Sequence, residues 1–353
     1  MTRTARLANQ GELISALPYI LGFHPRDAVV LVFLRDRQVR LTARLDLPPP
    51  PGPLPREVSL PLQQSIRGEQ PDVVMVVVYD DTRKAYRGLL NQLTRLCRRE
   101  GVRLGDRLLV AEGRWRELNC SDPRCCPAEG RPVRSGDEVP AVAEFVAMGV
   151  NPLPDRESIE RFFEPRGESV LDVTSPPADP PATGITQWRR DGLSAWARIL
   201  GVPSARDGEM ADGPAREANE VDQPLAQRAV DLLADIRARD ALLGWLCPDL
   251  SAYVATTSRT KRLLAECLGS HRLPVDPAES AELTWRLREF ARALPPAAQV
   301  GVLTMTGAHS WWLGEGIFAR VALERAVDLD PSHELAGLLL NLVYAGVRLR
   351  PGA

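Results

Sequence analysis

The chain has 353 residues, of which 44% are apolar and 25% are charged. This length favours two hydrophobic cores, because a single core rarely grows past roughly 250 residues. The formal net charge of −2 gives no broadly basic surface, so we expect no general nucleic-acid binding. The longest apolar runs, 28–34 and 73–79, are far shorter than the ~20 residues of a membrane-spanning helix. Polar residues from Asn9 to Glu12 interrupt any secretory core, so we expect a soluble, cytoplasmic protein that does not enter a membrane.

The first elements combine helix and strand signals. Asn9 followed by Glu12 resembles a helix capping box, and the apolar residues after it recur at helical spacing up to Gly22. Gly22 is suited to close this helix, because glycine adopts the left-handed conformation without strain. Residues 28–34 and 39–47 predict two strands whose short connection is typical of a β-hairpin.

The rest of the first half completes an α/β pattern. The prolines between residues 48 and 55 end the hairpin, since they lack the donor that a strand ladder needs. The elements expected after them are helices at 58–66, 82–100, 139–150 and 156–163, and strands at 73–79, 108–111 and 115–118. This order predicts an α/β domain over residues 1–164, with a mixed sheet and flanking helices.

The second half shows only helical signals. Residues 165–224 form a Pro-rich and acidic linker region with one expected helix at 186–200. Residues 225–348 predict an all-α helical domain, with helices at roughly 225–247, 251–269, 278–293, 297–312, 317–327 and 332–347. Near its end, Gly307, Ala319, Ala326 and Pro331 have the spacing of a single tetratricopeptide-like helical hairpin.

Several segments resemble one protein family. They are LISALPYILGFHPRD at 13–27, ARLDLP at 43–48, VYDD at 78–81, CSDPRCCP at 120–127, RD at 239–240 and GEGIFARVALERA at 314–326. Together they resemble domain-of-unknown-function family 4192, which is found chiefly in actinobacteria. The resemblance covers most of the chain and implies a shared domain layout. It implies no particular activity.

The most distinctive local feature is a group of three cysteines, Cys120, Cys125 and Cys126, within seven residues. If the loop curls, three thiols can face one centre, and thiolates are preferred ligands of zinc. A structural zinc site needs a fourth ligand, for which His24 is one candidate. Two other interpretations stay open: a redox-labile pair such as Cys120 with Cys125, or thiols without a chemical role. The sequence identifies no cofactor: zinc is possible, but thiols without a chemical role are the favoured interpretation.

A second group of candidate ligand-binding residues is His24, Asp27, Asp80 and Asp81. The two adjacent carboxylates follow an expected buried strand, where open α/β sheets place ligand-binding acids. They could hold a divalent cation or transfer a proton. The simpler alternatives are that Asp81 or Thr82 caps the next helix and that His24 is a hydrogen-bonded turn residue.

Three hypotheses for function follow. The leading one is a non-enzymatic interaction or regulatory module that binds a protein partner through its helical domain. The second is a small-ligand-binding or enzymatic α/β domain that uses the acids at the strand end. The third is a structural module stapled by zinc. The pattern identifies no catalytic residue, so whether the protein is an enzyme stays open.

Overall fold

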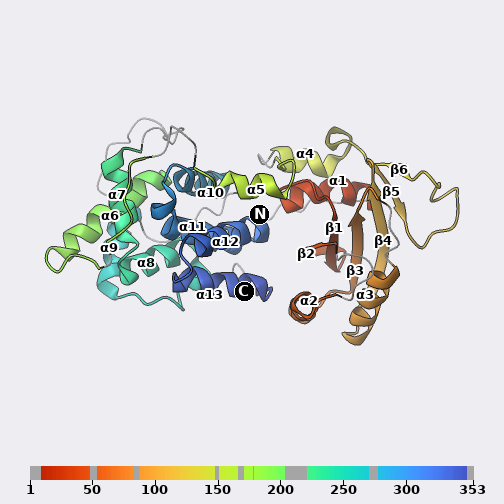
Figure 1. The fold of residues 1–353 in the computed structure, drawn as a ribbon, viewed down its shortest axis with the longest axis horizontal. Coiled ribbons are helices and arrows are strands. Elements are labelled where there is room, and N and C mark those ends of the chain that lie inside the picture. The colour runs from red at the N-terminus through yellow and green to blue at the C-terminus, as the bar shows by residue number, and fades with distance from the viewer. Residues whose placement is uncertain are drawn as a thin grey trace. The chain divides into compact units, whose positions relative to one another are not determined.

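The computed structural model describes residues 9–47, 54–82, 87–147, 151–165, 171–177, 179–202, 221–269 and 277–347 (Figure 1). Contacts divide the chain into two compact units. The N-terminal unit comprises Met1–Ser158 and Tyr344–Val347, and the helical unit comprises Ile159–Val343 and Arg348–Ala353. The domain boundaries predicted at residues 164 and 224 stay predictions.

The N-terminal unit is built on one mixed sheet, as the sequence predicts. In the described part of the chain the sheet has six strands in the order β2-β1-β3-β4-β5-β6. Only β3 and β4 are parallel, and they are joined by a helix, α3, because a parallel connection needs a long crossover. The strands are β1 (Ala28–Arg35), β2 (Gln38–Asp46), β3 (Val73–Tyr79), β4 (Arg103–Ala111), β5 (Arg114–Glu117) and β6 (Arg131–Pro132).

Two tight hairpins fix the strand register. Asp36 and Arg37, which join β1 to β2, have φ angles of +52° and +63°. Glu112 and Gly113, which join β4 to β5, have φ angles of +50° and +71°. Two consecutive left-handed residues are the mark of type I′ turns, whose twist matches that of the strands. The short connection predicted after residue 35 is therefore confirmed.

Helices cover the sheet on both faces. Helices α2 (Arg56–Glu69) and α3 (Arg87–Arg99) pack on one face, where alternate residues of β1 and β3 such as Leu31 and Val76 form a core. Helices α1 (Gln10–Leu21) and α4 (Pro140–Ala147) contact each other around a smaller core that includes Ala16. In Figure 1 these two helices lie on the side of the strands away from α2 and α3. Strand β3 is consequently buried almost throughout, as its β-branched run predicts.

Helix α1 shows how local sequence sets an element's ends. The Asn9 side chain accepts a hydrogen bond from the Glu12 backbone N–H at 3.0 Å, which is the predicted cap. Gly22 closes the helix with φ of +82°.

The helical unit has no strand among its described residues. It contains α6 (Ile185–Leu200), α7 (Gln223–Leu232), α8 (Ile236–Leu246), α9 (Ser258–Leu268), α10 (Pro277–Arg292), α11 (Pro296–Trp312), α12 (Gly316–Leu329) and all of α13 (Glu334–Tyr344) except its last residue. Helix α5 (Arg156–Phe162) is divided between the two units after Ser158. Trp196 of α6 is fully buried, donates to the Ala229 carbonyl at 2.9 Å and meets Phe290 edge to face. The predicted helix at 186–200 is thus part of this unit's core.

In the helical unit, two of the predicted helices differ from the observed ones in where they begin or end. The single helix expected at 225–247 is two helices, because Asp235 caps α8 by accepting the Ala238 N–H at 2.9 Å. The helix expected from residue 251 begins only at Ser258, where Thr257 provides the cap. Apolar periodicity continues on both sides of Asp235, so it does not reveal that break.

The predicted terminal hairpin falls on α11 and α12. A Cβ atom at Gly307 would lie 2.6 Å from Leu323, so glycine allows the two helices to approach closely. Ala319 and Ala326 are fully buried. The likeness to a tetratricopeptide hairpin stays a prediction. None of the described helices is both long and apolar enough to cross a membrane.

Candidate metal centre

The three cysteines lie in the loop that joins β5 to β6, residues 118–130, here called the cysteine loop. The ends of the loop are held together, because Trp115 pairs with Arg131. Gly130 makes the return to the sheet at φ of +78°, and a Cβ atom there would lie 3.0 Å from the Trp115 carbonyl oxygen. Glycine is therefore required by both backbone conformation and space.

A tight turn brings the two ends of the cysteine motif together. The Asp122 carbonyl accepts the backbone N–H groups of Cys125 at 3.1 Å and Cys126 at 2.7 Å. The Asp122 side chain accepts the Arg124 N–H at 2.9 Å, a local bond typical of aspartate in turns. The turn reverses the chain so that Cys125 and Cys126 return toward Cys120.

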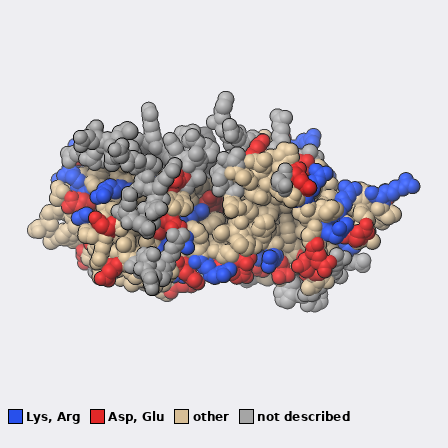
Figure 2. Space-filling model, turned by 90° about the horizontal axis from the view of Figure 1, so that it is seen from above, with Lys and Arg blue, Asp and Glu red and all other residues tan. Residues whose placement is uncertain are grey.

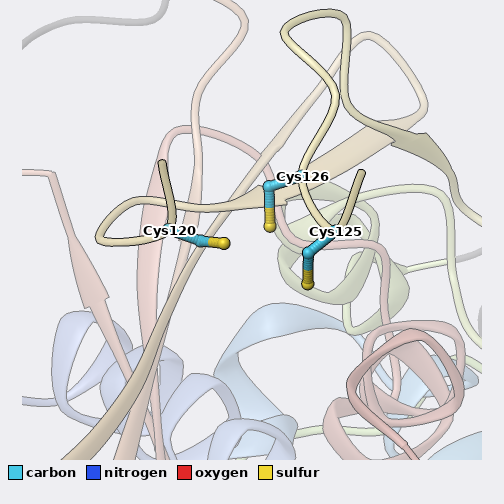
Figure 3. Close-up of side chains that lie close together, drawn as sticks. All are labelled: Cys120, Cys125 and Cys126. Atoms are coloured by element: carbon cyan, nitrogen blue, oxygen red, sulfur yellow. The ribbon is translucent and has the colours of Figure 1, made fainter. Parts of the chain in front are cut away.

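The three sulfur atoms of Cys120, Cys125 and Cys126 all lie within 4.8 Å of one another (Figure 3). Zinc bonds thiolate sulfur at ~2.3 Å, so tetrahedral coordination needs sulfur–sulfur separations of about 3.8 Å. Cys125 is exposed, whereas Cys120 and Cys126 are half-buried. The spacing of the cysteines in the sequence allows this convergence but does not determine it, because it depends on the conformation of the loop.

The thiols influence one another's protonation. A hydrogen bond with the backbone of Glu117 holds the pKa of Cys126 below its ordinary value, and hydrogen bonds with the other two thiols lower it further. For Cys120, a hydrogen bond with the Asp122 backbone lowers the pKa, but the two neighbouring thiols and burial outweigh it and raise the pKa. Metal binding at such a cluster would release the thiol protons, since the thiolate is the ligand.

His24 is not part of this cluster. Among the described residues, the only histidine, cysteine or acidic side chains that gather at metal-ligand distances are the three cysteines. His24 is an exposed residue between α1 and β1, and its backbone N–H donates to the Leu153 carbonyl at 2.9 Å. Partial burial of the ring and the nearby Arg26 lower its pKa. The suggestion that His24 supplies the fourth ligand therefore finds no support in the geometry.

The predicted acidic residues share one edge of the sheet. Ala28 at the start of β1 pairs with Tyr79 at the end of β3, which in turn pairs with Val110 of β4. Asp27 directly precedes Ala28, and Asp80 directly follows Tyr79. Strand register therefore places them at the same edge, as a site at the strand ends would require.

Two of the three carboxylates at this edge, those of Asp80 and Asp81, are nevertheless engaged in turns. Asp80 is buried, and its oxygens accept the Thr82 backbone N–H at 2.7 Å and the Thr82 hydroxyl at 2.6 Å. Asp81 is exposed and accepts the Glu112 N–H at 2.7 Å, so it fixes the β4–β5 turn. Asp27 is exposed with φ of +43°. Residues 83–86, which precede α3, lie outside the described residues, so the predicted capping of that helix stays a prediction.

Two buried acidic residues of the helical unit have partners in the chain. Asp235 pairs with Arg189 at 2.6 Å while it caps α8. Asp240 pairs with Arg239 at 2.9 Å and also accepts the Ala255 N–H at 3.0 Å. The Arg-Asp pair at 239–240 that contributed to the family resemblance therefore connects α8 to the segment before α9.

His309 is a buried histidine that the sequence did not single out. Its Nδ1 lies 3.0 Å from the Leu246 carbonyl, which fixes the proton on this nitrogen, and its ring stacks on Trp312. Burial lowers its pKa to about 4, with the backbone bond opposing and the charge of Arg288 assisting the shift. His309 is therefore neutral at pH 7 and acts as a structural donor.

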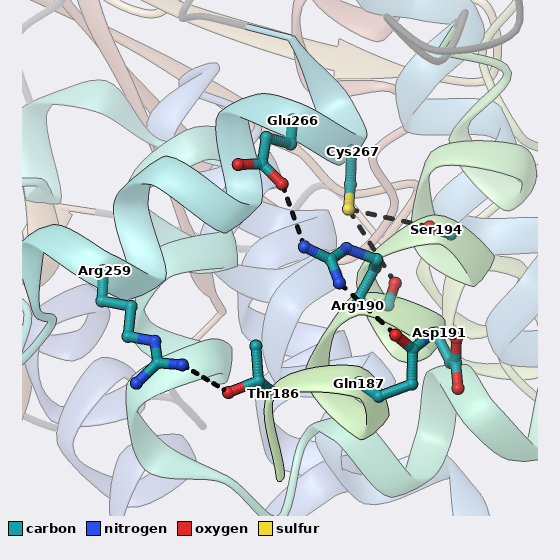
Figure 4. A network of polar contacts seen from close by, with 8 residues as sticks. All are labelled: Thr186, Gln187, Arg190, Asp191, Ser194, Arg259, Glu266 and Cys267. Atoms are coloured by element: carbon teal, nitrogen blue, oxygen red, sulfur yellow. Dashed lines mark hydrogen bonds and ion pairs between the residues drawn. The ribbon is translucent and has the colours of Figure 1, made fainter. Parts of the chain in front are cut away.

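Polar contacts also join α6 and α9 near the surface (Figure 4). Arg190 pairs with Glu266 at 3.2 Å, and Arg259 donates to the Thr186 hydroxyl at 3.0 Å. Both links are partly solvent-exposed, so they contribute specificity of packing more than stability. Over the face drawn in Figure 2, basic and acidic side chains are interspersed, with no large area of one sign among the described residues.

The sequence matches one known family model. It is described as a domain of unknown function (DUF4192), and the match covers residues 11–349, which include both units and the cysteine loop. The chain belongs to this family. No curated protein and no solved structure matches the chain. The family description assigns no activity, so a function must be argued from the site.

Proposed function

We propose that this member of the DUF4192 family is a non-enzymatic interaction or regulatory module whose N-terminal unit holds one zinc ion. The ligands are Cys120, Cys125 and Cys126. The observation that carries the proposal is the convergence of their three sulfur atoms within 4.8 Å. Soft thiolate ligands favour zinc over magnesium or calcium, which prefer oxygen.

The metal would restrain the cysteine loop. Cys120 lies shortly after β5, and Cys125 and Cys126 lie beyond the turn at Asp122, so one ion bonded to all three links both halves of the loop. Residues 121–125, which include the ligand Cys125, are exposed. A restrained exposed loop presents a fixed shape to a partner and loses less conformational entropy on binding. A bound metal ion would in this way help an interaction module to bind its partner.

The enzymatic alternative receives less support. Its candidate acids, Asp80 and Asp81, are bonded to Thr82 and to the Glu112 backbone, as turn-forming carboxylates are. Neither lies with His24 in a cluster of ligands among the described residues. These bonds account for the presence of both carboxylates at this place without a substrate or ligand. A protein partner bound through the helical unit stays a prediction.

The metal content of the full-length protein tests the proposal. We expect protein purified anaerobically after expression with added zinc to contain about one zinc ion per chain by elemental analysis. Replacing each ligand, as in Cys120→Ser, Cys125→Ser and Cys126→Ser, should remove most of the zinc. Cys97→Ala is the matched control, because Cys97 is buried in the sheet core, where burial raises its pKa to about 11.

Thiol titration distinguishes zinc binding from the redox interpretation, in which two of the cysteines form a disulfide. All six cysteines of the structure are free thiols. A metal-free protein with six titratable thiols after denaturation would contradict the zinc proposal. A metal-free protein with four thiols, six minus one disulfide pair, would favour the redox interpretation instead.

A further inference from the structure

The cysteine cluster has three protein ligands, and no fourth donor gathers with it among the described residues. Between residues 1 and 158 the sequence has one histidine, His24, and four cysteines, of which three form the cluster. The remaining donors are therefore His24 and Cys97. Zinc in proteins is almost always four-coordinate, and sites with three protein ligands leave the fourth position to water or another molecule.

Neither remaining donor reaches the cluster. Cys97 lies on α3, 2% exposed, in the core between that helix and the sheet. His24 lies between α1 and β1, and neither residue belongs to the group of ligands within 4.8 Å. Among the described residues no histidine, cysteine or carboxylate joins the three sulfurs, so the structure shows three protein ligands and leaves the fourth position to a molecule from solution.

The outer side of the cluster is open to solvent. Five consecutive residues, from Ser121 to Cys125, are exposed, and Cys125 contributes one of the sulfurs. Figure 3 shows that the Cys125 side chain and its two partners come from the two arms of one loop, not from packed helices or strands. A small molecule could therefore reach a metal held here without any opening of the fold.

We infer, building on the proposed function, that the fourth position of this zinc centre binds a small thiol from solution. Three thiolates more than neutralise a divalent ion, which makes the metal a weak activator of bound water and a poor hydrolytic centre. The centre instead favours a further soft donor. In the exchange, the thiol loses its proton to solvent, its sulfur bonds to zinc, and the bound water leaves.

The full-length protein loaded with Co²⁺ in thiol-free buffer tests this inference. Cobalt occupies zinc sites and reports its ligands through visible absorption. Three thiolates predict a sulfur-to-metal charge-transfer band together with the d–d bands of a tetrahedral ion. Added 2-mercaptoethanol should shift the d–d bands to longer wavelength and raise the charge-transfer intensity by roughly a third, one thiolate added to three. The response should saturate.

Matched controls separate the inference from the proposed function. Ethylene glycol, which has a hydroxyl in place of the thiol, should leave the spectrum unchanged. His24→Ala and Cys97→Ala should bind Co²⁺ and respond to the thiol as the wild type does. If the spectrum of the cobalt-loaded protein does not change when the thiol is added, the inference of a thiol-binding fourth position is wrong. The same holds if the His24→Ala spectrum differs from the wild type before thiol is added, since His24 would then be a ligand. Neither result contradicts metal binding by the three cysteines. Failure to bind Co²⁺ at all would remove the metal centre and this inference together.

Discussion

The cysteine loop and the interior of the helical unit differ in whether their polar side chains are buried with partners or exposed. In the helical unit, Asp235 is 3% exposed and is paired both with Arg189 and with a helix N-terminus. In the loop, Cys125 is exposed, and its sulfur lies within 4.8 Å of the sulfurs of Cys120 and Cys126. Buried groups with partners in their own chain hold the fold together. Exposed groups that converge on one point remain available for a ligand.

The largest effect that tests this contrast is expected at Asp235. Asp235→Ala should lower the free energy of unfolding by about 3–5 kcal/mol, because it leaves Arg189 without its partner and α8 without its cap. Urea denaturation measures this change. Glu266→Ala is the control, since its pair with Arg190 is partly exposed and should contribute at most about 1 kcal/mol. Equal losses in the two variants would contradict the distinction between buried and exposed pairs.

His309 predicts a pH dependence of the helical unit. Its folded-state pKa of about 4 lies below the unfolded value of 6.5, so the folded state resists protonation. The stabilisation is fully present above pH 6.5 and is lost as the pH falls from there through about 4, for a total of about 3 kcal/mol.

The His309→Gln variant isolates this contribution. Unfolding free energies of wild type and variant should be compared at both ends of the pH window. Subtraction removes the effects of all other titrating groups, including His24 and His333, whose pKa values are also lowered. We expect the wild type to lose more stability than the variant. Parallel pH profiles would show that His309 is not buried in its neutral form.

Gly130 tests whether the return of the cysteine loop is fixed by its backbone. Gly130→Ala should cost about 2–3 kcal/mol, from the left-handed conformation and from contact with the Trp115 carbonyl, and it should weaken metal binding. Gly113→Ala is the matched control. Gly113 has φ of +71° but nothing within 4 Å of an added Cβ, so only the conformational part of the penalty applies. Thermal unfolding and zinc titration of both variants measure the difference, and equal zinc affinities would contradict the proposed role of Gly130.

The smallest effect is expected at the sheet edge. Asp80→Ala should lower stability by about 1–2 kcal/mol through loss of its bonds to Thr82, whereas Asp80→Asn keeps an acceptor and should lose less. Both variants should retain the wild-type zinc content. Loss of metal in either variant would show that the sheet edge and the cysteine loop form a single site.

The sequence predicted most elements of the sheet because their signals are local. The Asn9 cap, the Gly22 terminus and the β-branched run of β3 each depend on a few adjacent residues. Strand β6 was missed, because two residues, one of them Pro132, carry no alternating pattern. The break at Asp235 was missed because apolar residues continue on both sides of it.

The candidate site was predictable only in part. The cysteine spacing allowed convergence, but the turn at Asp122 that produces it is set by backbone bonds which spacing does not show. The strand-end position of Asp80 and Asp81 was correctly placed at the sheet edge. Their engagement with Thr82 and Glu112 depends on a turn conformation and on a hairpin from another part of the chain, so sequence alone left a ligand-binding role open.

X-ray absorption at the zinc edge, recorded on the full-length protein in thiol-free buffer, tests the central claim most directly. The account predicts three sulfur neighbours at about 2.3 Å and one lighter atom in the wild type, and loss of most of the zinc signal in Cys125→Ser. A protein without bound zinc, or zinc with fewer than three sulfur neighbours in the wild type, would contradict it.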